Sequence, residues 1–269
     1  MHLSGLFIYP VKSLRGVAVE SARLDTLGLA GDRRFLVVDA ENRFLTQRST
    51  PRLALIETAL TATSLILRNP AHGSAAIGLH DRGDTLTVTI WRDTVQAVDC
   101  GVEIAVWLSD FLRQPCRLVR VGADYRRAVD PVRAGPGHQV GFADAFPLLL
   151  LGEGSWHDLN DRLLAQGEEP VPLDRFRANL IVHGSRPYAE DDWRDFRIGE
   201  IALRNAGPCA RCVIITTDQT TAGRSPEPLR TLAAYRRDPH EPGNVNFARN
   251  IIHLQKSGTL RVGDPVILA

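Results

Sequence analysis

The chain is short of cysteine, of net charge and of long apolar runs, and each shortage excludes a class of protein. Four cysteines in 269 residues are too few for a disulfide-built scaffold, which favours a reducing cytoplasm. A formal net charge of +1 provides no field that would attract nucleic acid or an anionic membrane. No window reaches the roughly 18 apolar residues of a membrane span, and no signal peptide is evident at the start. We therefore expect a cytoplasmic protein without a nucleic-acid partner or a membrane span.

Lysine is nearly absent as well. All but two of the 32 basic residues are arginine, the exceptions being Lys12 and Lys256. Codon drift in a GC-rich genome accounts for a general preference for arginine. A second interpretation concerns Lys12 alone, because a compact ammonium group can occupy a position where the planar guanidinium fork does not fit.

Two of the four cysteines lie three residues apart in Gly207–Gly223, which reads GPCARCVIITTDQTTAG. Arg211 lies between Cys209 and Cys212, and a neighbouring guanidinium favours the thiolate form of a cysteine. Structural zinc needs four ligands, usually from two such pairs, and the two remaining cysteines are too widely spaced to form the second pair.

Three other interpretations of the cysteine pair can be weighed. A thioredoxin-like dithiol places its first cysteine at a helix N-terminus, whereas the β-branched run Cys212–Thr217 predicts a strand. Two inert buried thiols are the simplest interpretation, because free cysteine is often buried. The last is a single thiolate that ligates a transition metal together with a bound cofactor.

The remaining pattern predicts many short strands, which indicates a barrel or sandwich and no βαβ units. In the first 121 residues we expect one helix, Gly101–Arg113, and strands at Leu3–Val11, Val17–Asp25, Arg34–Asp39, Leu53–Leu60, Ser64–Arg68, Thr85–Trp91, Thr94–Val98 and Cys116–Val121. Later we expect strands at Pro147–Leu151, Phe176–His183, Ile198–Asn205, Cys212–Thr217, Asn246–Gln255 and Thr259–Leu268, and helices at Ser155–Gln166, with Ser155 as N-cap, and Pro226–Arg237.

The loosest stretch is Gly122–Phe146, which is rich in arginine, proline and glycine. A loop of this length in a compact protein is a binding loop or lid, or else a disordered arm. We place the domain boundary beside it, which divides the chain into residues 1–120 and 121–269.

Several motifs together resemble one family. PCARCVIITTD, FRANLIV and the closing GTLRVGDPVIL are similar to the MOSC domain, a molybdenum-cofactor-binding fold. IYPVKSLRG and GLAGDRRFLVVD are similar to the β-barrel domain that precedes MOSC domains, as in the mitochondrial amidoxime-reducing components and their bacterial counterparts. The resemblance covers nearly the whole chain. It implies a mainly β (α+β) protein, in which an N-terminal β-barrel-like domain is followed by a MOSC β-barrel domain with peripheral helices.

The resemblance also implies a site. By the family's CxRC motif, Cys212 is the molybdenum ligand and Cys209 only a neighbour. Asp144 falls where family members place an aspartate near the metal, and Ala145 offers no hydroxyl where some relatives have one. The residues implied to bind the cofactor are Lys12, Ser13, Arg33, Arg177, Asn179 and Arg211. Cationic groups of this kind suit the phosphate of a pyranopterin, because a buried anion must be paired.

The implied function is that of a molybdenum-cofactor-dependent oxidoreductase which reduces N-hydroxylated compounds such as amidoximes, hydroxylamines and N-hydroxylated bases. Because no further cysteine cluster follows in the chain, we expect electrons from a separate protein, either ferredoxin-like or a flavin reductase. The alternative is a non-catalytic carrier of the molybdenum cofactor or of its sulfur. A complete cofactor sulfurase is not expected, because it needs a pyridoxal-phosphate domain with a Schiff-base lysine. A degenerate scaffold that only mediates interactions is the third alternative.

Overall fold

The computed structural model describes residues 1–269. Strands predominate, and they are β1 His2–Ile8, β2 Val17–Ala18, β3 Ser21–Asp25, β4 Gly28–Leu29, β5 Phe35–Asp39, β6 Glu57–Leu60, β7 Ser64–Asn69, β8 Gly73–Gly78, β9 Thr85–Ile90, β10 Asp93–Asp99, β11 Cys116–Val121, β12 Leu148–Gly152, β13 Leu180–His183, β14 Asp195–Ile198, β15 Ile201–Ala210, β16 Asn246–His253, β17 Thr259–Arg261 and β18 Val266–Leu268. The helices are α1 Val102–Leu112, α2 Pro131–Ala134, α3 Glu153–Ala165 and α4 Leu229–Tyr235, and the 3₁₀ turns are η1 Pro51–Leu55, η2 Leu173–Phe176, η3 Ala189–Asp191 and η4 Val213–Thr216. The predicted mainly β class is confirmed.

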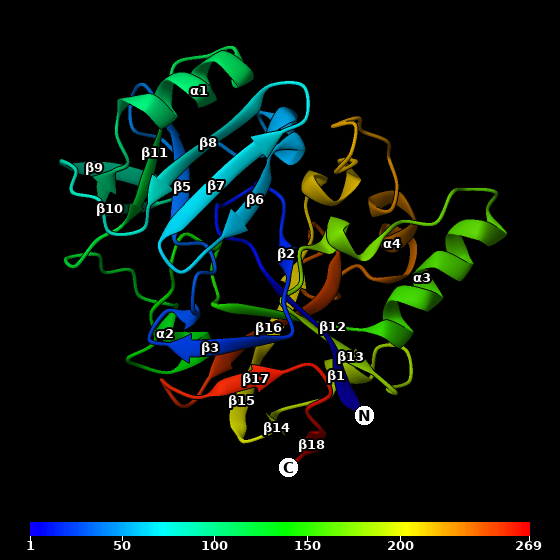
Figure 1. Cartoon of the computed structure of the whole chain (residues 1–269). Helices are drawn as coiled ribbons and strands as arrows, with labels where there is room; N and C mark the ends of the chain where they lie inside the picture. The colour runs from blue at the N-terminus through cyan, green and yellow to red at the C-terminus, as the bar shows by residue number, and fades with distance from the viewer.

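The N-terminal half contains two antiparallel sheets, β5-β11-β10-β9 and β6-β7-β8, with α1 packed against β11 and β8 (Figure 1). Helix α1 forms because Ile104, Leu108, Phe111 and Leu112 recur at helical spacing and make one apolar face. That face is buried with Leu118 of β11 in a single core cluster. The predicted helix Gly101–Arg113 and strand Cys116–Val121 are therefore confirmed to within a residue at each end.

The C-terminal half is built on an eight-stranded sheet of order β18-β14-β15-β16-β12-β13-β1-β2. Strand β1 belongs to this sheet, because it pairs antiparallel with β13, and β3 likewise pairs with β17. Leu3 and Leu24 from these early strands share a core cluster with Leu150 and Phe196. The first residues of the chain thus complete the sheets of its second half.

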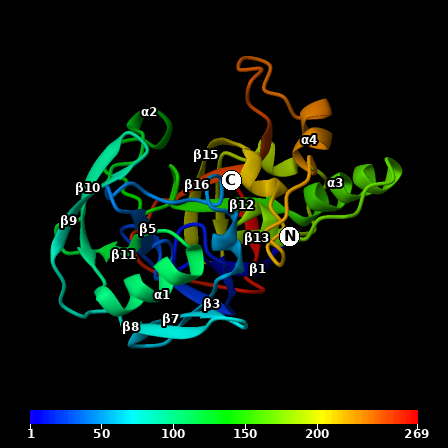
Figure 2. The ribbon, with the colours of Figure 1, turned by 90° about the horizontal axis from the view of Figure 1, so that it is seen from above.

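Helices α3 and α4 lie on the side of the molecule opposite α1 and the β6-β7-β8 sheet, with β1, β12 and β13 between (Figure 2). Their inward residues, Leu159 and Leu232, pack with Phe176 and Phe247 in one core cluster. The predicted helix Pro226–Arg237 is confirmed in its central part only.

The predicted strand Cys212–Thr217 is wrong. Strand β15 pairs with β16 only as far as Ala210, so the residues that follow have no neighbouring strand on which to form a ladder. Their backbone bonds close locally instead: the amide of Ile215 donates to the carbonyl of Cys212 at 3.2 Å, and Thr217 donates to Ile214 at 3.0 Å. The result is the 3₁₀ turn η4. Tertiary context overrides the β propensity of this apolar run.

Two other predictions on local structure also fail. Ser155 does not cap α3, which begins at Glu153. The buried hydroxyl of Ser155 donates to Glu190 at 2.7 Å and accepts from the amide of Tyr188 at 2.7 Å. The predicted strand Leu53–Leu60 is divided, because Pro51 starts the 3₁₀ turn η1 and only Glu57–Leu60 pairs as β6.

The segment Gly122–Phe146 is packed against the body of the protein. Val129, Val140 and Phe142 are buried in two different core clusters, and α2 lies within the segment, capped by the side chain of Asp130. It is a structured connection between the halves, and it carries Asp144 to the site.

Candidate functional site

The predicted site residues converge on one cavity between the two halves of the chain. Its wall includes every predicted residue except Cys212, namely Lys12, Ser13, Arg33, Asp144, Arg177, Asn179 and Arg211. Phe176, Ile214 and Cys209 also line it. The volume is about 130 Å³, which is small beside the roughly 300–1,000 Å³ of common ligand pockets. A ligand of pterin size therefore requires side chains that line the cavity to move outward.

Three residues of this wall have a left-handed backbone. The φ angles of Ser13, Arg33 and Arg177 are 68°, 47° and 56°. Residues other than glycine seldom adopt this conformation, and it costs free energy that surrounding contacts must offset. Arg33 donates its amide to the carbonyl of Tyr9 at 2.8 Å, and Arg177 closes η2 through a bond to Asp174 at 3.2 Å. Such strain concentrates at functional sites, and here it falls on three of the predicted cofactor-binding residues.

A buried network holds Arg33 and Asn179 in place. The Arg33 guanidinium donates to Asp32 at 2.6 Å and to the amide oxygen of Asn179 at 2.9 Å. The amide nitrogen of Asn179 donates in turn to Asp32 at 3.1 Å. Arg33 and Arg177 both lie against the ring of Tyr9, at 4.3 and 4.5 Å from its centre. Sequence reasoning missed Asp32 and Tyr9, although each lies within a motif used for the prediction.

The buried ammonium of Lys12 forms an ion pair with the half-exposed carboxylate of Asp144, and both residues line the cavity. Arg48 also contacts the Asp144 carboxylate, at 3.3 Å, and the indole nitrogen of Trp91 donates to it at 3.2 Å. Burial lowers the pKa of Lys12 to about 8, although Asp144 acts in the opposite direction. Burial by itself would raise the pKa of Asp144, but the charges of Lys12 and Arg48 hold it well below its usual range. At neutral pH this wall therefore carries an ammonium ion and a carboxylate.

Arg127 fixes the backbone that presents Asp144. Its side chain is 5% exposed and donates to the Asp93 carboxylate at 2.7 Å. The same guanidinium donates to the carbonyls of Gly141, at 3.1 Å, and of Asp144, at 2.8 Å. One buried arginine thus joins β10 of the N-terminal half to the segment on which Asp144 lies.

The two cysteines of the pair have different surroundings. Cys209 lies in β15 and lines the cavity, and its sulfur accepts a hydrogen bond from Arg211 at 3.1 Å. Cys212 precedes η4, is partly buried and is not part of the cavity wall. The assignment of Cys212 as the metal ligand therefore stays a prediction.

Buried guanidinium groups at the site have unused donors. Nη2 of Arg177 and Nε of Arg211 are inaccessible to water and have no hydrogen-bond partner, and the same is true of Nη1 of Arg48. Burial, together with the charge of Arg33, lowers the pKa of Arg177 to about 10. Unpaired buried donors cost free energy, and an anion in the cavity would satisfy them. The donor set therefore fits a phosphate-bearing cofactor.

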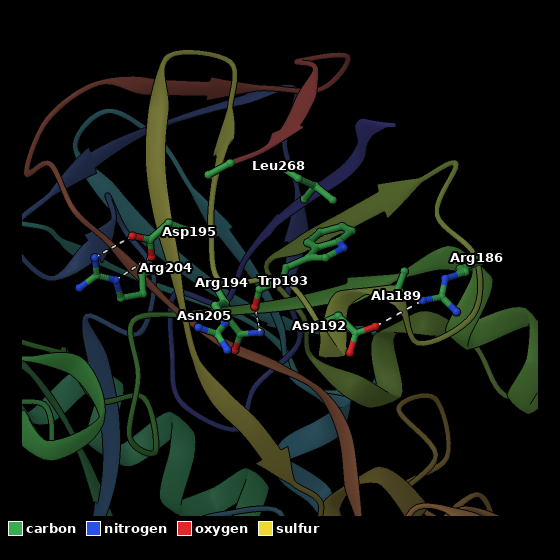
Figure 3. Close-up of a pocket in the computed structure, with 10 residues that line it drawn as sticks. Arg186, Ala189, Asp192, Trp193, Arg194, Asp195, Arg204, Asn205 and Leu268 are labelled. Atoms are coloured by element: carbon green, nitrogen blue, oxygen red, sulfur yellow. Dashed lines mark hydrogen bonds and ion pairs between the residues drawn. The ribbon is translucent and has the colours of Figure 1, made fainter.

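A larger cavity of about 850 Å³ lies beside β14, β15 and β18, at one edge of the eight-stranded sheet (Figure 3). None of the predicted residues lines it. Most of its charged side chains are paired, because Arg204 lies 2.7 Å from Asp195 and Arg186 lies 3.3 Å from Asp192, which leaves Arg194 without an ion-pair partner. Its lining therefore carries less excess positive charge than that of the smaller cavity, where Lys12 and three arginines face a single carboxylate, Asp144.

The protein has no group of three or more His, Cys, Asp or Glu side chains that could hold a metal ion. No helix is both long enough and apolar enough to cross a membrane.

Comparison with known proteins supports the resemblance seen in the motifs. Residues 1–115 match the MOSC N-terminal beta barrel domain and residues 137–267 match the MOSC domain. The chain is 36% identical over 291 residues to mitochondrial amidoxime-reducing component 1 of Homo sapiens, with 98% of this chain and 81% of that protein covered. The chain belongs to this MOSC-domain family. The corresponding protein of Mus musculus is 35% identical over 278 residues, with the same coverage.

The MOSC relatives also include the molybdenum cofactor sulfurase of Danio rerio, 33% identical over 275 residues, which are 93% of this chain but 32% of that protein.

The two matched MOSC regions both contribute to the cavity. Lys12 and Arg33 come from the first, and Arg177 and Arg211 come from the second. The domain boundary at residue 120 falls between the matched regions and stays a prediction.

Proposed function

We propose that this protein is a molybdenum-cofactor-dependent reductase of N-hydroxylated compounds such as amidoximes, hydroxylamines and N-hydroxylated bases. The observation that carries the proposal is the set of unpaired, buried donors of Arg177 and Arg211 in a cavity lined by a thiol. Relatives named amidoxime-reducing components over nearly the whole chain support it.

The residues divide into two groups by what they would hold. Arg33, Arg177 and Arg211 would receive the phosphate of the cofactor, with Asn179 and Ser13 beside them. Cys212 is proposed as the thiolate ligand to molybdenum, since thiolates suit this kind of metal. When bound, the cofactor supplies the two-electron redox chemistry that removes oxygen from nitrogen.

One proton for the reaction would come from the chain and the second from solvent. Removal of an N-hydroxyl oxygen as water consumes two protons as well as two electrons. Nζ of Lys12 holds a proton beside the Asp144 carboxylate, and with a pKa of about 8 it can release that proton near neutral pH. Asp144, ionised and half-exposed at the cavity, would accept hydrogen bonds from the substrate and orient it.

Electrons would come from a separate ferredoxin-like protein or flavin reductase, and a cytoplasmic location stays a prediction. The second candidate is a non-catalytic carrier of the cofactor or its sulfur. The similarity to molybdenum cofactor sulfurases favours it.

Two measurements test the proposal. Protein expressed with cofactor synthesis intact should contain about one molybdenum per chain, as expected for a single thiolate ligand; zinc or no metal would refute the proposal. The loaded protein should reduce benzamidoxime with an artificial one-electron donor. A loaded protein that turns over none of this substrate would support the carrier.

A further inference from the structure

A second opening adjoins the cofactor cavity on the side of Asp144. It encloses about 860 Å³ and shares Asp144 and Ala145 with that cavity. Phe44, Arg48 and Trp91 from the N-terminal half also line it. A molecule in this opening would therefore meet the Asp144 carboxylate in a space that Arg177 and Arg211 do not line.

Trp91 is an unusual residue for its position. Strand β9 ends at Ile90 and β10 begins at Asp93, so Trp91 and Arg92 form a two-residue hairpin turn. Such turns favour glycine, asparagine and aspartate, because their backbone is left-handed. Trp91 has a φ of 56° and is 44% exposed, so burial of the indole offsets little of the strain. The contacts of the indole at the opening are the remaining reason for a tryptophan here.

Those contacts join the indole to the site. Nε1 of Trp91 donates to Asp144 at 3.2 Å. The guanidinium of Arg48 lies over the indole, 4.5 Å from the ring centre, and the ring of Phe44 lies 4.9 Å away. Nη1 of Arg48 is buried without a hydrogen-bond partner. The opening thus combines an aromatic wall, a carboxylate and an unused donor.

We propose that Trp91 and Phe44 form the wall on which the flat part of an N-hydroxylated substrate stacks, and that this wall favours aryl amidoximes over small hydroxylamines. The inference rests on the proposed function and deepens it. The amino group of an amidoxime can donate to the Asp144 carboxylate, while its oxygen can accept from Arg48. An aryl ring attached to the same planar group then lies against the indole, where aromatic contact adds to binding. Hydroxylamine offers the polar contacts without the ring.

Steady-state kinetics of the loaded enzyme test the wall. Replacing Trp91 by alanine removes the ring, whereas Trp91→Phe keeps a ring and loses only the N–H donor. We expect the ratio of kcat/KM for benzamidoxime to that for hydroxylamine to fall about fivefold in Trp91→Ala and to stay within about twofold in Trp91→Phe. An unchanged ratio in Trp91→Ala, or an equal fall in both variants, would overturn the proposal, because Trp91 would then act only by positioning Asp144.

A binding measurement separates this inference from the proposed function. Benzamidoxime added to loaded protein without any electron donor should quench tryptophan fluorescence, and the quenching should disappear in Trp91→Phe. Trp107→Phe is the matched control, because Trp107 lies on α1 against Phe111 and should leave the quenching intact. Quenching without turnover would refute the reductase and keep the binding site. Turnover without Trp91-dependent quenching would refute the site. The site would also be refuted if the Trp91 variants changed only the KM for a protein electron donor.

Discussion

The guanidinium of Arg211 donates to the sulfur of Cys209 at 3.1 Å, although Arg211 is the immediate neighbour of Cys212 in the chain. The backbone of Arg211 continues the extended path of β15, since its amide donates to Val245 at 2.7 Å. Side chains two residues apart on an extended chain lie on the same face. The two thiols of the pair are therefore chemically unequal.

The inequality leads to a prediction on the metal. Cys212→Ser should lose most of its molybdenum and its activity, because a hydroxyl is a poor replacement for a thiolate ligand. Cys209→Ser should retain the metal and show a milder loss of activity. Metal analysis and the charge-transfer absorption of both variants measure this. Equal loss in the two variants would point to a dithiol, and loss confined to Cys209→Ser would transfer the ligand role to Cys209.

Arg177 should contribute to cofactor binding more than to folding. Its Nη1 donates to the carbonyl of Leu14 at 2.6 Å, while Nη2 has no partner. Arg177 has no carboxylate partner, so its replacement by an apolar chain of similar length removes a desolvated charge and leaves no buried charge unpaired. Arg177→Met should therefore change the free energy of unfolding of cofactor-free protein by no more than about 1 kcal/mol, yet sharply lower the molybdenum and pterin content. Arg186→Met, in the cavity of Figure 3, is the matched control. Full cofactor content in Arg177→Met would contradict the assignment.

Lys12 should set the alkaline limit of activity. Because the pKa of Lys12 is lowered to about 8, the proton on Nζ is lost as pH rises through 8, and turnover should fall with it. Stability should move the other way. Between pH 8 and the unfolded-state pKa of about 10.4, the unfolded chain holds this proton more tightly, so the contribution of Lys12 to the free energy of unfolding rises with pH.

Pre-steady-state reduction of benzamidoxime across pH 6 to 10, roughly the range around these pKa values, measures the alkaline limit. Lys256→Arg, at the other lysine of the chain, should leave the profile unchanged. Arginine does not titrate in this range, so Lys12→Arg should remove the decline near pH 8 even if its rate is low. A decline that persists in Lys12→Arg would assign it to another group.

Arg127 should contribute both to the stability of the fold and to the position of Asp144. Loss of its guanidinium leaves the carbonyls of Gly141 and Asp144 without their donor, and a buried acceptor without a partner costs about 1–3 kcal/mol. Arg127→Met should lower the free energy of unfolding by about 3 kcal/mol. The adjacent Arg126→Ala should change it by less than about 0.5 kcal/mol, because Arg126 is exposed.

Denaturant unfolding measures the effect of Arg127→Met on stability, and kinetics at saturating substrate measure its effect on the site. If Arg127 positions Asp144, Arg127→Lys should recover stability better than it recovers kcat, because a lysine cannot reproduce the fork that spans two carbonyls. Equal recovery of both would indicate a structural role alone.

Much of the N-terminal half was readable from the sequence. The alternation of β11 and the apolar stripe of α1 are local patterns, and their burial follows from the same pattern. Predictions failed where a strand needed a partner that local sequence does not reveal, as in Cys212–Thr217. The prediction of Ser155 as N-cap failed for a related reason, because its hydroxyl donates to Glu190, which lies 35 residues further along the chain.

The family, the mainly β class and seven of the 17 residues that line the cavity can be inferred from the chain alone, because these depend on motifs of a few consecutive residues. The contacts among those residues depend on the tertiary structure. It showed that β1 completes the C-terminal sheet, that Arg211 faces Cys209, and that Trp91 reaches Asp144 from the other half of the structure. The pairs Lys12–Asp144 and Arg33–Arg177 lie more than a hundred positions apart in the chain, and they meet because of how the sheets pack, which no local pattern encodes.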